Sequence, residues 1–179
     1  TKWSQVIFMS FVAAMLIPFQ AIMYPLIQFF DTLGLKNVYG LVFMYGGFGL
    51  SMSIFLYHGF VKGVPKGIEE AGIIDGCNIF QLFSHVVLPL LSSITVTVIV
   101  LNSMWIWYDY LLPFLVIGNS TTKTLVLELY FARILAGQFG NPWELIFPSV
   151  LVTIIPIVII FLLLQKYIVK GITEGAIKS

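Results

Sequence analysis

Three carboxylates gather in the stretch VPKGIEEAGIIDGCNIF, residues 64–80, of a chain in which only 9% of the residues are charged. Glu69, Glu70 and Asp75 are the side chains that could act as a general acid and base, which work in pairs at a reacting atom. The chain offers no Cys/His cluster with metal-ligand spacing, and its single Cys77 has no second cysteine to pair with. An enzyme active site therefore has weak support, and the charges need another explanation.

Nucleotide chemistry has no support either. No Gly-rich loop that ends in Gly-Lys-Ser/Thr occurs in the chain, and GVPKGIEE does not approximate one. We expect no catalytic residue, no metal ligand and no cofactor in this chain, and we expect that it does not bind ATP itself.

Composition indicates a membrane protein. Hydrophobic residues make up 59% of the 179 residues and aromatic residues 16%, and the mean hydropathy is +1.01, which is more apolar surface than one soluble core can bury. The net charge is only +1, and the basic residues are scattered, so nucleic acid is not expected as a partner.

An all-α integral membrane protein with about four spans is the expected fold class. A span takes roughly 20 mainly apolar residues, and the candidate spans are residues 5–30, 38–60, 85–107 and 144–164. The connection 108–143 begins with YLLPFLVI, which is apolar but too short to cross. The chain begins with Thr1, and we interpret it as a fragment or a trimmed domain.

Basic residues near the ends of the spans predict the orientation, because Lys and Arg are retained on the cytoplasmic side. If Lys2 lies inside, five more lysines lie inside with it: Lys62, Lys66, Lys166, Lys170 and Lys178. Residues 62–80 then form a cytoplasmic loop, residues 108–143 an outer-side loop and residues 165–179 a cytoplasmic tail.

Within the cytoplasmic loop the sequence predicts a short helix. Pro65 suits its first turn and Gly76 suits its end, while Asn78 and Gln81 have the spacing of a capping box for the next helix. One helix face carries small residues, at positions Ala71, Gly72, Asp75 and Gly76. A small face allows another protein's backbone to come close, and Glu69 and Glu70 are available to basic groups of that partner.

The string GIEEAGIIDGCNIFQLFSHVVLPLL closely resembles the EAA loop in permease subunits of binding-protein-dependent ABC importers. The matching residues are Glu70, Ala71, Asp75, Gly76, Leu88, Pro89 and Leu90. Two positions depart from the family pattern, because Gly72 replaces the usual second Ala and Ser93 stands where a Pro often follows. Gly72 is expected to weaken the helix by roughly 1 kcal/mol relative to Ala.

The resemblance extends along the whole chain. The runs IPFQAIMYPLIQFFDTLGLKNVYGLV, WYDYLLPFLVI and QKYIVKGITEGAIKS look like the carbohydrate-type subfamily of these permeases. The resemblance implies one MetI-like permease domain over residues 1–179. Such subunits carry six spans, so the first two would be missing.

The family resemblance also implies partners and a location. A sugar importer permease of this kind pairs with a second permease subunit, a cytoplasmic ATPase dimer that binds the ATP, and an extracytoplasmic solute-binding protein, in a bacterial or archaeal inner membrane. The coupling residues implied are Glu69, Glu70, Ala71, Gly72, Asp75 and Gly76. A permease for a non-sugar solute is the alternative. A secondary transporter is less favoured, since it would show ionisable residues near a span centre and a repeated half.

Polar residues inside the spans are candidates for the substrate pathway. Gln20, Tyr24 and Gln28 recur at i, i+4 and i+8, and Pro18 and Pro25 are each expected to break the backbone hydrogen-bond ladder there. A second set at i, i+3 and i+7 could hold a sugar by hydrogen bonds and ring stacking: Asn102, Trp105 and Asp109. The alternatives are hydrogen bonds to neighbouring helices for the first set and interface anchoring for the aromatic rings.

Small residues in the second span predict close helix packing. Gly47 with Ser51 and Gly49 with Ser53 form small-xxx-small pairs. The second permease subunit is one candidate for the helix that packs there.

Overall fold

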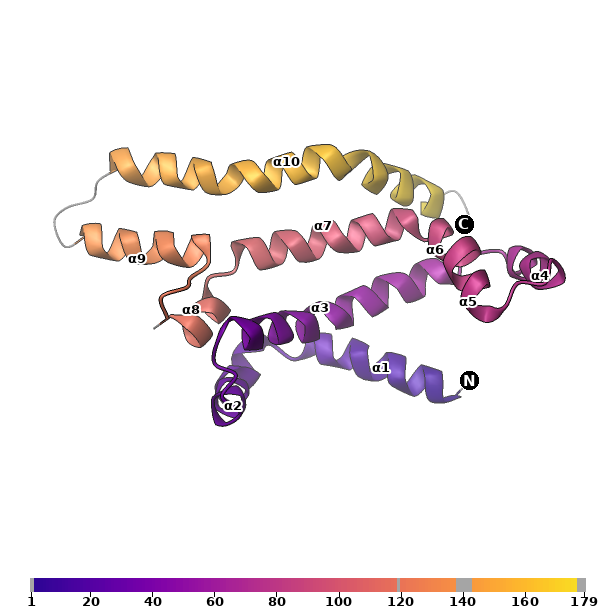
Figure 1. Ribbon diagram of the computed structural model, residues 1–179, viewed down its shortest axis with the longest axis horizontal. Helices are drawn as coiled ribbons and strands as arrows, with labels where there is room; N and C mark the ends of the chain where they lie inside the picture. The colour runs from indigo at the N-terminus through magenta and orange to yellow at the C-terminus, as the bar shows by residue number, and fades with distance from the viewer. Residues whose placement is uncertain (1, 119, 138–142, 177–179) are drawn as a thin grey trace.

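A computed structural model describes residues 2–118, 120–137 and 143–176, and every regular element in these ranges is a helix. The expected all-α fold class is confirmed. Figure 1 shows the long helices running side by side, with α4, α5 and α6 at one end of the molecule, which we call the α4 end, and α8 and α9 at the other, the α9 end. The helices are α1 (Lys2–Leu16), α2 (Phe19–Thr32), α3 (Val38–Val61), α4 (Lys66–Ile74), α5 (Ile79–Gln81), the π-helix η1 (Leu82–Val87), α6 (Leu88–Leu90), α7 (Ser92–Tyr108), α8 (Leu111–Ile117), α9 (Leu125–Gly137) and α10 (Trp143–Ala176).

Two helices are each long and apolar enough to cross a membrane, namely α3 and the segment Ile146–Gln165 of α10. Two further pairs of helical segments are long and apolar enough only when each pair is taken together. The axis of α2 is bent by 102° relative to that of α1, and α7 is bent by 71° relative to the segment Ile79–Leu90. The described residues thus contain up to four spans, if each bent pair makes one. The predicted number agrees with this upper limit, but two of the predicted spans are not straight helices.

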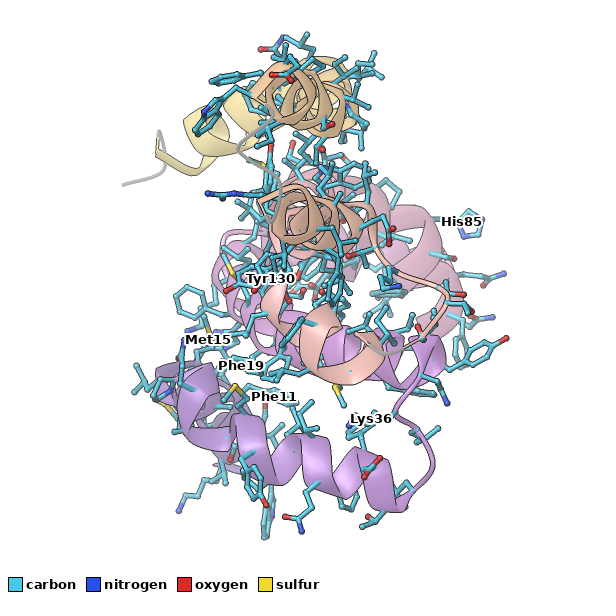
Figure 2. All side chains as sticks on the ribbon, turned by 90° about the vertical axis from the view of Figure 1, so that its left-hand side faces the viewer. Phe11, Met15, Phe19, Lys36, His85 and Tyr130 are labelled. Carbon is cyan, nitrogen blue, oxygen red and sulfur yellow. The ribbon has the colours of Figure 1, made fainter. Side chains whose placement is uncertain are left out.

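The first predicted span, residues 5–30, is not one continuous helix but the two helices α1 and α2. Pro18 adopts an extended conformation, with φ −65° and ψ 137°, between α1 and α2, so the predicted break there is confirmed. Pro25 lies inside α2, so the helix continues through this residue, although proline has no N–H to donate to the preceding turn. Figure 2 shows Met15 and Phe19, from the two sides of the break, close to each other, and both line one cavity with residues of α3 and α7.

The third predicted span, residues 85–107, also needs correction. The helix bends at Leu91, whose backbone N–H is shared between the carbonyl oxygens of Val87 and Leu88, at 3.1 Å each. Pro89 has no N–H to donate to the preceding turn, which removes one helical hydrogen bond at this point. The straight part of the span therefore begins at Ser92.

Two apolar clusters hold the helices together. At the α9 end Leu41, Met44 and Tyr45 of α3 pack against Leu112, Val116 and Ile117 of α8 and Leu127 of α9. Nearer the α4 end Leu91, Ile94 and Val98 pack against residues of α3. Hydrogen bonds join the long helices as well: the Tyr57 hydroxyl donates to Thr95 Oγ1 at 2.8 Å, and Trp107 Nε1 donates to the Thr153 carbonyl at 2.9 Å.

The helices leave much of their apolar surface uncovered. Leu151, Leu162 and Leu163 of α10 are each more than half exposed, at 62%, 56% and 65%. Such a large exposed apolar surface is expected where lipid or a partner protein covers a helix.

Candidate functional site

The predicted short helix of residues 62–80 is present as α4. Pro65 stands in extended conformation immediately before it, and Gly76 ends it with a φ of +82°, a conformation that glycine adopts without strain. The N–H of Cys77 donates to the Gly72 carbonyl and that of Gly76 to the Ile73 carbonyl, both at 3.0 Å. These two bonds form a Schellman C-cap, so the predicted start and end of this helix are confirmed.

The predicted capping box is also confirmed. The Gln81 N–H donates to Asn78 Oδ1 and the Asn78 N–H donates to Gln81 Oε1, both at 2.9 Å. The box starts α5 directly after the Gly76 turn. The chain therefore reverses direction within a few residues and returns toward α7 through η1, a wide π-helical segment of a type often found at functional sites.

The small face predicted for α4 is only partly open. Gly72 is buried, and a Cβ at this position would lie 2.6 Å from Leu82 Cδ1 and 3.6 Å from Val86 Cγ2. The side chains of η1 therefore cover Gly72. The prediction that this glycine offers its face to a partner is corrected, because Gly72 positions α4 against η1 of its own chain.

The other predicted coupling residues lie on the surface. Glu70, Ala71, Asp75 and Gly76 are exposed, and Glu69 is half-buried. The same stretch of chain also exposes four apolar side chains that were not predicted as site residues, namely Ile73 (61% exposed), Ile74 (84%), Ile79 (75%) and Phe80 (82%). We call these four residues, with Glu70, the α4 surface.

The exposed apolar side chains of the α4 surface could contribute to binding, as the acidic residues beside them could. Exposed apolar side chains between charged residues are typical of surfaces that contact another protein or a membrane. The signal in the sequence was the placement of isoleucine and phenylalanine between charged residues, outside the spans.

The first predicted pathway set lies on α2 and keeps its shared face. Gln20, Tyr24 and Gln28 are all exposed. The opposite, apolar face of α2, with Phe19 and Phe30, packs on the core and lines a cavity of about 660 Å³ that also contains Asn102 and Trp105. The two predicted sets therefore do not share this cavity.

Asn102 belongs to the contact between α7 and α3. Its Nδ2 donates to the Val98 carbonyl at 2.9 Å and to Ser53 Oγ at 3.3 Å. A Cβ on Gly49 would lie 2.5 Å from Asn102 Oδ1, so the close packing predicted for Gly49 and Ser53 occurs within this chain. Asn102 therefore forms a hydrogen bond that joins α7 to α3.

Asp109 also makes internal hydrogen bonds. Its Oδ2 accepts from the Tyr45 hydroxyl at 2.9 Å, and its Oδ1 accepts from the backbone N–H groups of Leu111 at 3.0 Å and Leu112 at 3.5 Å. The carboxylate thus caps the first turn of α8 and ties it to α3. Trp105 packs edge-on against Tyr45, with ring centroids 5.6 Å apart.

An open hollow remains beside Trp105 and Asp109. It has a volume of about 440 Å³ and is also lined by Leu101, Met104 and Tyr108. Asp109 follows α7 in extended conformation, with φ −72° and ψ 128°, so the predicted helical face of three residues ends before it. Trp105 and Asp109 nevertheless line one hollow, while Asn102 lines the cavity toward α2 and α3.

We expect Gly49→Ala to loosen the packing of α3 on α7. The added methyl would meet Asn102 Oδ1, and overpacking of this kind typically costs about 1–3 kcal/mol of stability. The melting temperature of the purified transporter measures the effect. Gly46→Ala on the same helix is the matched control, since nothing lies within 4 Å of a Cβ there. Equal melting temperatures for the two variants would contradict the prediction.

Comparison with known proteins agrees with this architecture. Residues 1–174 match the family described as the binding-protein-dependent transport system inner membrane component. A probable starch degradation products transport system permease protein, AmyC of Thermoanaerobacterium thermosulfurigenes, is 44% identical over 99% of this chain and 64% of its own length. The multiple sugar-binding transport system permease protein MsmG of Streptococcus mutans is 33% identical over the same shares.

The chain belongs to this family of inner membrane transport components, and the expected MetI-like fold is confirmed. A further relative, the melibiose/raffinose/stachyose import permease protein MelC of Bacillus subtilis, is 31% identical over 100% of this chain and 64% of its own length. The chain thus spans about two thirds of the length of these relatives.

Proposed function

We propose that this chain is part of a permease subunit of an ATP-driven sugar importer. With a second permease subunit it would line the translocation pathway, and an extracytoplasmic solute-binding protein would deliver the sugar. A cytoplasmic ATPase dimer would bind the ATP, so this subunit is a transport component and no enzyme. The observation that carries the proposal is the similarity over the whole chain to permeases that are named for sugar transport, at up to 44% identity.

The coupling of this permease to the ATPase is assigned to residues 62–80. In support, α4 stands at one end of the helices (Figure 1), is fixed to η1 through Gly72 and presents exposed apolar and acidic side chains. A rigid helix with an uncovered apolar surface suits docking into a groove of a partner. Residues 62–80 are then cytoplasmic, and α9 lies on the outer side.

Uptake measurements test the proposed function. A strain that lacks the full-length gene should lose ATP-dependent uptake of radiolabelled maltotriose or raffinose, while proline uptake stays at the parental level. Restoration by the intact gene is the control. Unchanged uptake of every sugar tested would contradict the sugar assignment. Uptake that depends on a proton gradient and not on ATP would contradict the class of transporter.

The substrate-pathway role of Trp105 and Asp109 stays a proposal, and Asp109→Ala should reduce uptake by this transporter. Two effects contribute, because the variant removes a carboxylate from the hollow beside Trp105 and removes the cap of α8. Tyr45→Phe separates them, since it removes the Tyr45 hydrogen bond but leaves the carboxylate in the hollow. A change in KM for the sugar with Asp109→Ala alone indicates substrate contact. Unchanged uptake with Asp109→Ala would remove the residue from the pathway.

A further inference from the structure

A hollow between α1 and α3 at the α4 end is unused by the proposed function. It consists of two adjoining cavities of about 630 and 790 Å³, which share Phe8, His58 and Lys62 in their linings. The rings of Phe8 and His58 stack between the two helices, with centroids 3.7 Å apart. The first cavity extends to Val64 and Pro65, the residues that lead into α4.

The charged side chains that line this hollow are all basic. Lys2 and Lys62 line the larger cavity together with His58, and none of the residues that line either cavity is acidic. The other lining residues are apolar or uncharged. Two ammonium groups with an imidazole beside them favour an anionic group.

The adjacent surface of α1 suits a lipid. Val6 and Met9 line the larger cavity and are 58% and 63% exposed, and Trp3 near the end of the helix is 80% exposed. Tryptophan concentrates at the boundary between lipid and water. Basic groups at the cytoplasmic end of an apolar helix surface bind anionic lipid headgroups, whose acyl chains lie along the helix.

We propose that this hollow binds the headgroup of an anionic phospholipid, such as phosphatidylglycerol, and that the bound lipid steadies the segment leading into α4. The proposal rests on the orientation in the proposed function, which places the α4 end at the cytoplasmic surface. The headgroup would contact Lys2 and Lys62, and the acyl chains would cover Val6 and Met9. A lipid at this place would influence how firmly α4 is held during coupling.

Native mass spectrometry of the full-length permease in its assembled transporter tests the proposal, with phosphatidylglycerol and phosphatidylcholine as probes. We expect phosphatidylglycerol to be retained preferentially. Lys2→Gln with Lys62→Gln should weaken its retention by about 25-fold, because each lysine near an anionic lipid surface contributes about five-fold. Lys66→Gln is the matched control, since Lys66 is exposed, lies four residues beyond Lys62 and is absent from both linings.

Four outcomes would overturn the proposal. Equal retention of the two lipids would show that the charge of the headgroup is not recognised. An equal loss with Lys66→Gln would show attraction to the basic surface in general. Retention unchanged in the double variant would show that the lipid binds elsewhere or that protein fills the hollow. Displacement of the lipid by millimolar inorganic phosphate would identify a free-phosphate site instead. The readout does not require transport, so it is independent of the test of the proposed function.

Discussion

Gly72→Leu should largely abolish the stimulation of ATP hydrolysis by sugar in the assembled transporter. Because a Cβ at position 72 would already lie 2.6 Å from Leu82 Cδ1, a leucine side chain must displace the Leu82 side chain or push α4 away from η1. Overpacking of this size costs about 1–3 kcal/mol. The cost falls on the contact that holds α4 in place, so coupling should be lost while the spans and the ATPase stay intact.

The chain offers a matched control for this variant. Gly67→Leu makes the same change on the same helix, where nothing lies within 4 Å of a Cβ, and it should leave most of the stimulation intact. The double variant Gly72→Leu with Leu82→Ala returns space to the contact and should restore part of the coupling. Loss of stimulation in Gly67→Leu to the same degree, or full stimulation in Gly72→Leu, would contradict the role given to Gly72.

Ile74→Asp and Phe80→Asp should each prevent stable association with the ATPase. These side chains are 84% and 82% exposed, so their replacement removes little packing within the chain. A central apolar residue of a protein interface typically contributes about 2 kcal/mol or more, which corresponds to roughly a 30-fold loss of affinity. Copurification of the ATPase with the permease pair measures the effect.

Two further variants make this second experiment specific. Leu33→Asp is the control, since Leu33 is also more than half exposed, at 54%, but is the C-cap residue of α2, a helix that lies far from α4 (Figure 1). The ATPase should copurify normally with this variant. Glu70→Lys reverses an exposed charge of the α4 surface and should weaken association if the partner groove is basic. Normal copurification with Ile74→Asp and Phe80→Asp would exclude the α4 surface as the ATPase contact.

Local signals made α4 predictable from sequence. Pro65, Gly76 and the pair Asn78 and Gln81 act through their own backbone and near neighbours, so their effect does not depend on the rest of the fold. The covering of Gly72 was not predictable in this way. It depends on Leu82 and on the π-helical path of η1, which bring together residues ten positions apart.

The other differences between the predicted and the observed site also arise from contacts between segments that are far apart in the sequence. Helical periodicity placed Asn102, Trp105 and Asp109 on one face, but the hydrogen bonds to Ser53 and Tyr45 come from α3, and no pattern within α7 specifies them. Ile74 and Phe80 were missed because apolar residues are abundant in this chain, and only the arrangement of α4 and α5 at the tip of the molecule distinguishes these two (Figure 1).

Cross-linking of the α4 surface tests the central claim most directly. Ile74→Cys in a Cys77→Ser background places one thiol on the most exposed isoleucine of that surface. In the assembled transporter we predict that a bifunctional maleimide links this thiol to the ATPase, and that bound ATPase protects it from a water-soluble monofunctional maleimide. No cross-link, together with equal labelling of the thiol in the presence and absence of the ATPase, would contradict the claim that residues 62–80 couple this permease to its ATPase.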